Sequence, residues 1–106
     1  MSFSAEDKIV QLESLLADDP TDHLGFFMVG KLYLDLGRAP EAADRFAKCV
    51  ALAPDYTAAW RFLGDAWRKA GDAEQARAAY TQGIAVGERI GDLQTVKEMQ
   101  AFLRKL

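Results

Sequence analysis

The sequence predicts an all-α fold in which antiparallel helix pairs stack side by side, with about six helices. Three observations support this prediction. The sequence repeats itself at a spacing of 34 residues, its apolar and aromatic residues recur at helical spacing, and proline or glycine punctuates the ends of the apolar segments. A fixed period of this length is typical of stacked helical units that bury their apolar faces only against one another.

The repeat becomes visible when the sequence is displaced by 34 positions. Aromatic residues then fall on aromatic residues, and glycines fall on glycines. The aligned pairs are Phe26 with Trp60, Gly30 with Gly64, Tyr33 with Trp67, Gly37 with Gly71, Ala42 with Ala76, and Phe46 with Tyr80. The sequence therefore predicts two full repeats, residues 23–56 and 57–90.

This spacing resembles the tetratricopeptide repeat (TPR) family. The resemblance implies two antiparallel helices, A and B, in each repeat, stacked as a right-handed α-solenoid. It also implies a concave groove, lined by the A helices, that usually holds an extended peptide or a helix of a partner. Within this pattern Trp60, Leu63, Gly64 and Trp67 are expected in the core. The resemblance names no partner.

The first helix is predicted to begin at Ser4 and to run to about Ala17. Ser4 can accept a hydrogen bond from an unpaired amide of the first turn, as in a capping box. Leu12 and Leu15 lie 34 positions before Phe46 and Cys49. Residues 4–18 are therefore interpreted as the B half of a truncated repeat, an N-terminal capping helix.

Pro20 ends that helix, and Thr21 and Asp22 can cap the next one. An A helix is predicted over residues 23–36, followed by a turn at Gly37, where a glycine allows the backbone to reverse tightly. Pro40 begins a B helix that continues to about Leu52, because proline is tolerated in the first turn, where amides lack helical partners.

The second repeat copies this pattern, with an A helix over residues 57–70, a turn at Gly71, and Asp72 capping a B helix that ends at Gly91. Asp92 then caps a final helix to about Lys105. This helix, residues 92–105, is interpreted as a C-terminal capping helix that covers the last apolar face of the stack. All elements belong to one domain, residues 1–106.

The composition of the chain argues against several classes of function. The net charge of −3, from 13 basic and 16 acidic residues, argues against nucleic acid binding. Apolar runs are too short to span a membrane, and the start of the chain shows no basic leader, so we expect a cytoplasmic protein. With Cys49 as the only cysteine and His23 as the only histidine, we expect no metal, no cofactor and no catalytic residue.

The resemblance also implies which side chains line the groove. The first repeat would present Leu24, Phe27, Met28 and Lys31, and the second Arg61, Phe62, Asp65, Arg68 and Lys69. Val96 and Met99 would close the far side. Apolar anchors therefore lie beside a basic strip, which predicts another protein or peptide, with acidic flanks, as the partner. The carboxylate clamp of some family members is absent, because Phe27 and Phe62 stand at two of its positions.

Two alternatives remain open at this point. Phe27 and Met28 either await a partner or are covered by the N-terminal helix or by the curvature of the stack. The function is either a non-catalytic adaptor that binds a peptide segment or a helix, or a self-assembling protein whose spare apolar surface forms a homodimer. The acidic first half and mildly basic second half of the chain would suit such self-association.

Overall fold

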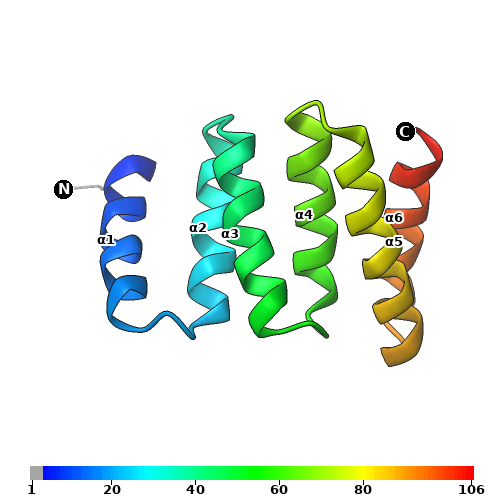
Figure 1. The fold of residues 1–106 in the computed structure, drawn as a ribbon, viewed down its shortest axis with the longest axis horizontal. Helices are drawn as coiled ribbons and strands as arrows, with labels where there is room; N and C mark the ends of the chain where they lie inside the picture. The colour runs from blue at the N-terminus through cyan, green and yellow to red at the C-terminus, as the bar shows by residue number, and fades with distance from the viewer. Residues whose placement is uncertain (1–3) are drawn as a thin grey trace.

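The computed structural model describes residues 4–106. The first three residues of the predicted domain, where the absence of a basic leader is expected, lie outside the described part. These residues form six helices: α1 (Ala5–Asp18), α2 (His23–Asp35), α3 (Ala39–Leu52), α4 (Thr57–Lys69), α5 (Ala73–Ile90) and α6 (Leu93–Arg104). Figure 1 shows them standing side by side, from α1 at one end to α5 and α6 at the other. The prediction of an all-α stack of six helices is confirmed.

Local capping fixes where the helices begin. The Ser4 hydroxyl accepts a hydrogen bond from the Asp7 amide at 3.1 Å, and the Asp7 carboxylate accepts one from the Ser4 amide at 3.3 Å. This reciprocal pair is the predicted capping box at α1. Aspartates cap three further helices in the same way, each carboxylate accepting from the amide three residues later: Asp22 for α2, Asp72 for α5 and Asp92 for α6.

The turn that follows each A helix repeats at the same spacing as the sequence. The Arg38 amide donates to the Tyr33 carbonyl at 2.9 Å, and the Asp72 amide donates to the Trp67 carbonyl at 2.9 Å. Each bond closes over a glycine with positive φ, as at Gly71, where φ is +84°. These are glycine-dependent helix ends, which satisfy carbonyls that the helix itself leaves unpaired.

Glycines also let the two helices of a repeat approach closely. A Cβ added at Gly30 would lie 2.7 Å from the Phe46 ring, and one added at Gly64 would collide with the Tyr80 ring. Both aromatic side chains are fully buried. The aligned glycines and aromatics of the sequence repeat are therefore the contacts that pair α2 with α3 and α4 with α5.

The core runs the length of the stack, and Trp60 and Trp67 contact both of its clusters. Leu63 and Gly64 are buried as predicted, whereas the two tryptophans are only half-buried. The Trp60 indole nitrogen explains part of this exposure, because it donates to the Pro54 carbonyl at 2.8 Å near the surface.

The last helix, α6, packs directly onto α5. Val96 lies against Gly87, and Met99 lies against Gly83, where a Cβ would meet the methionine sulfur. Both side chains are buried, so the expectation that they close the far side of the groove is wrong. They belong to the core because α6 turns its most apolar side toward α5.

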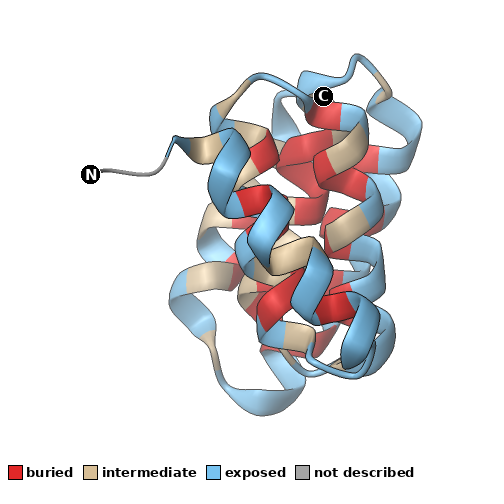
Figure 2. Ribbon diagram, turned by 90° about the vertical axis from the view of Figure 1, so that its left-hand side faces the viewer, coloured by how far each residue is buried: buried red, intermediate tan, exposed pale blue. Residues whose placement is uncertain are grey.

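The opposite end is more open. Figure 2 looks onto it: buried residues gather between the helices, and the helix nearest the viewer is mostly exposed. In α1 only Ile9 and Leu16 are buried. Within residues 4–106 none of the helices combines the length and the apolar character needed to cross a membrane.

Candidate partner-binding surface

Side chains from α2, α4 and α6 meet on one side of the molecule. The Lys31 ammonium lies 5.3 Å from the centroid of the Phe62 ring, which joins α2 to α4. Arg61 then joins α4 to α6, with its Nη1 atom 2.6 Å from the Glu98 carboxylate and its guanidinium 5.7 Å from the centroid of the Phe102 ring. The predicted A helices therefore do share a surface, and its two halves differ in chemistry.

The first half is an aromatic patch, formed by Phe27, Tyr56 and Phe62. The Phe27 ring centroid lies 5.0 Å from that of Tyr56 and 5.5 Å from that of Phe62. Beneath the patch, the fully buried Phe46 ring lies 5.7 Å from both phenylalanine rings. His23 packs edge-on against Tyr56 at 6.0 Å. Phe27 is therefore half-buried by its aromatic neighbours, not by the N-terminal helix.

The second half is a charged cluster around Asp65, which is only 6% exposed. Its carboxylate accepts a short hydrogen bond from the Tyr80 hydroxyl, and it lies 3.5 Å from Arg68 Nη2 and 3.7 Å from Arg61 Nε. Burial and the hydrogen bond to Asp65 raise the pKa of Tyr80 well above its usual value, so the hydroxyl stays protonated. Asp65, predicted as a groove contact, therefore lies beneath the surface and holds the two arginines in place.

The difference between the two halves of the surface follows from four positions at which the two repeats carry different residues. Three apolar residues and one lysine of the first repeat are replaced by a hydrogen-bonded, charged set in the second. Phe27, Lys31, Leu34 and Phe46 correspond to Arg61, Asp65, Arg68 and Tyr80. A hydroxyl on the buried ring needs an acceptor, and Asp65 supplies it. The paired change of Phe46 to Tyr80 and of Lys31 to Asp65 is the sequence signal that could have placed Asp65 in the interior.

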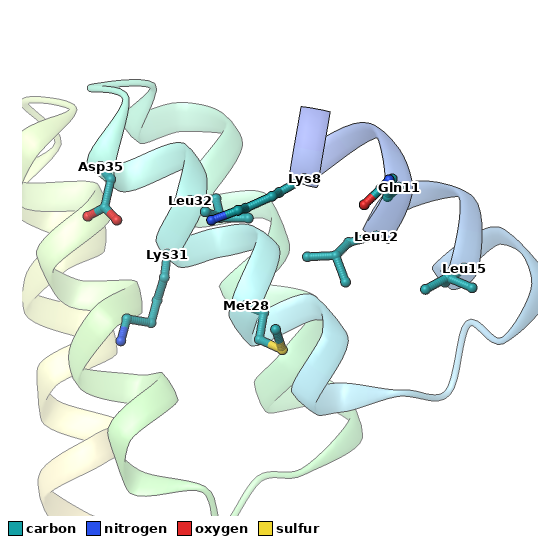
Figure 3. A pocket seen from close by; sticks show the side chains of 8 residues that line it. All are labelled: Lys8, Gln11, Leu12, Leu15, Met28, Lys31, Leu32 and Asp35. Atoms are coloured by element: carbon teal, nitrogen blue, oxygen red, sulfur yellow. The ribbon is translucent and has the colours of Figure 1, made fainter. Parts of the chain in front are cut away.

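Four of the predicted groove residues are exposed, namely Leu24, Met28, Lys31 and Lys69. Lys69 lies at the end of α4, Leu24 is 51% exposed on α2, and Met28 is 52% exposed. Met28 and Lys31 also line a cavity of about 490 Å³ between α1 and α2. The remaining lining residues are Lys8, Gln11, Leu12 and Leu15 from α1, with Leu32 and Asp35 from α2. Figure 3 shows Lys8 and Leu12 reaching from α1 toward α2.

Side chains that could bind a metal ion or act as a nucleophile are not gathered into a site in the described part of the chain. Within residues 4–106 no three His, Cys, Asp or Glu side chains lie close enough to hold a metal ion. Cys49 is fully buried, and burial raises the pKa of its thiol to about 11. Because the thiolate is the reactive form, this cysteine is inert at neutral pH.

Comparison with known proteins finds relatives in sequence and in structure. Residues 27–88 match the tetratricopeptide repeat family. The chain is 46% identical over 95 residues to TPR repeat-containing protein PA0015 of Pseudomonas aeruginosa, and the match covers 90% of each chain. It is also 35% identical over 74 residues to the tetratricopeptide repeat and J domain-containing co-chaperone DNJ1 of Fusarium oxysporum, of which it spans only 14%.

Solved structures show the same architecture. The solution structure of protein BPP2914 from Bordetella parapertussis superposes with a TM-score of 0.79 at 33% identity, covering 99% of this chain and 88% of that one. A crystal structure of MamA superposes with a TM-score of 0.76 at 17% identity, covering 83% of this chain and 48% of that one. The second likeness concerns the fold alone.

Proposed function

Because the chain belongs to the tetratricopeptide repeat family, we propose that it is a non-catalytic interaction module that binds a peptide segment or a helix of another protein on the surface shared by α2, α4 and α6. Repeats of this family generally mediate contacts between proteins. The observation that supports this surface is the aromatic patch, whose two phenylalanine rings pack on the buried Phe46 and remain partly exposed. Rigid aromatic groups are frequent anchors of protein interfaces, since they bury a large area at a small entropic cost.

Charge adds a preference to this proposal. Among the described residues, Lys31 has no carboxylate within ion-pair distance, whereas Arg61 and Arg68 are already paired with Asp65 or Glu98. An acidic group on the ligand would therefore meet Lys31 first, beside the rings of Phe27 and Phe62. The preferred ligand is a segment with apolar anchors and acidic flanks, bound with Phe27 and Phe62 as its main contacts.

The test compares two single variants of the full chain in affinity capture from the native source, followed by measurement of the dissociation constant for the partner obtained. Phe62→Glu places a charge in the aromatic patch and should weaken binding at least tenfold. Leu52→Glu places the same charge on α3, where Leu52 is exposed, and should leave binding unchanged. Circular dichroism must show both variants folded. Undiminished binding by a folded Phe62→Glu variant would refute the surface assignment.

Self-association is the second candidate function, and exposed apolar residues near α1 favour it. Val10 and Leu15 on α1 and Met28 on α2 lie largely in solvent. A homodimer would cover them. Light scattering over a range of protein concentrations tests this candidate. If the measured mass stays that of a monomer up to about 100 μM, any dimer is too weak to be a stable assembly.

A further inference from the structure

The cavity between α1 and α2 lies where the repeat pattern elsewhere places a helix. Adding 34 to each of its lining residues identifies the counterpart surface one repeat later. The residues from α1 correspond to Ala42, Arg45, Phe46 and Cys49 on α3. The residues from α2 correspond to Phe62, Asp65, Ala66 and Lys69 on α4. All eight therefore have counterparts on one B helix and on the A helix that follows it.

At the counterpart surface, that place is filled by α2. Gly30 of α2 lies against the Phe46 ring, and Phe27 of α2 contacts both Phe46 and Phe62. As a result Phe46 and Cys49 are fully buried. Their counterparts in the cavity are Leu12, which is half-buried, and Leu15, which is 63% exposed. The two surfaces correspond residue by residue, but only one of them is covered by a helix of the described chain.

The rim of the cavity indicates the charge of what would fill it. Two of its lining residues, Lys8 and Lys31, are basic. Asp35 is its single acidic residue. The floor is apolar, formed by Leu12, Leu15, Met28 and Leu32. A complementary helix would have one apolar side and acidic residues beside it.

The end helix of a second copy, α6, is a poor match for this cavity. This helix buries its apolar residues Val96 and Met99 against α5 and exposes Lys97 and Arg104, and the exposed Lys105 follows it. These cations would face Lys8 and Lys31. Repulsion between like charges therefore disfavours α6 as the occupant.

We propose that the cavity between α1 and α2 binds an amphipathic helix of a partner protein, seated as α2 is seated against α3 and α4. The helix presents a small residue toward Leu12, as Gly30 does toward Phe46, and acidic residues toward Lys8 and Lys31. It takes the position against α1 that α2 takes against α3. This site adjoins the aromatic patch, because Lys31 lines the cavity and also lies beside the rings of Phe27 and Phe62. Leu12 and Leu15 line the cavity and are not part of the patch.

The experiment uses a synthetic helical probe and the full chain. The probe has about 16 residues, with phenylalanine, glycine and tyrosine at the spacing of Phe26, Gly30 and Tyr33 and glutamates on the flanks. Its affinity is measured by fluorescence anisotropy. The matched variants are Leu15→Glu, inside the cavity, and Val10→Glu, on the same helix but outside it, where Val10 is 69% exposed. Both side chains are exposed enough that the substitutions should preserve the fold.

Leu15→Glu should weaken binding of the probe at least tenfold, and Val10→Glu should leave the affinity for the probe unchanged. A control probe with lysines in place of the glutamates should also bind at least tenfold more weakly. No binding of the glutamate probe at concentrations up to about 1 mM would overturn the proposal. Loss of binding by Phe62→Glu without loss by Leu15→Glu would overturn it too, and would place the probe on the aromatic patch. A wild-type dimer dissociated by Leu15→Glu would identify a second copy as the occupant instead.

Discussion

At the scale of single residues, Tyr80 and Phe46 show how one oxygen atom changes a repeat position. Both rings are fully buried against a glycine of the preceding A helix. Phe46 needs no polar partner and supports the aromatic patch. The Tyr80 hydroxyl needs an acceptor, and the buried carboxylate of Asp65, held by Arg61 and Arg68, provides it.

Cys49 gives a prediction about pH. In the unfolded chain its thiol ionises near pH 9, whereas burial raises its pKa in the folded chain to about 11. The thiol's contribution to stability is therefore complete below pH 9 and is lost as the pH rises toward 11, since only the unfolded state releases the proton in that interval. Between pH 9 and 10 the ionisation of tyrosines affects both chains alike, so denaturant titrations should show a smaller loss of stability for Cys49→Ala than for the wild type. Equal slopes would contradict the assigned pKa.

The same burial predicts how the thiol reacts. A thiol reagent at pH 8 should modify Cys49 only as fast as the chain unfolds, because the side chain has no exposed surface.

Trp60 gives a prediction about stability. Its side chain contacts both core clusters, and its indole nitrogen donates to the Pro54 carbonyl. Trp60→Ala should lower the free energy of unfolding by about 3 kcal/mol, toward the low end of the range for tryptophan because the ring is half-buried. Trp60→Phe, which keeps most of the ring but loses the hydrogen bond, should cost about 1 kcal/mol. Urea unfolding followed by circular dichroism measures both, and similar losses for the two variants would contradict a packing role.

At the scale of elements, the two end helices differ in how firmly they are attached. Figure 1 shows α1 standing apart at one end, and α5 and α6 overlapping at the other. The contacts agree, since Met99 of α6 is fully buried and the Phe102 ring stacks on the Tyr80 ring at 5.9 Å. In contrast α1 leaves Leu15 in solvent and encloses a cavity with α2.

This contrast predicts the result of two deletions. Removal of residues 92–106 uncovers Tyr80 and the side of α5 that contains Gly83 and Gly87. The resulting loss of unfolding free energy should be comparable with the total stability of a small domain, about 5–15 kcal/mol. The shortened chain should aggregate or lose most of its helical circular dichroism. Removal of residues 1–20 uncovers less core and should leave a folded stack. If the chain without α6 stays folded and monomeric, then α6 is a detachable helix.

At the scale of the whole molecule, the stack should unfold as one cooperative unit. The core clusters share Trp60 and Trp67, so neither repeat can lose its packing without exposing the other. Calorimetry of the wild type should show a single transition whose calorimetric and van't Hoff enthalpies agree. Two separated transitions would mean that the repeats fold independently, as happens in long repeat arrays when neighbouring contacts are weak.

The sequence alone determined the helices and their ends. Caps such as Ser4 and Asp72, the turn glycine Gly71 and the aligned pair of Gly64 and Tyr80 act over short distances or repeat at a fixed spacing. Each of these signals can be read without knowing the rest of the structure. For this reason the predicted helices agree with the structure.

Only the tertiary structure decided which side chains of the predicted groove are open. Helical spacing gives the direction in which a side chain leaves its own helix, but its exposure depends on what another helix places opposite. Asp65 is buried because Tyr80 and two arginines surround it, Val96 is buried because α6 turns toward α5, and Met28 stays exposed because no helix of the described chain fills the cavity beside it. Burial is a property of neighbours distant in sequence, and local patterns do not contain it.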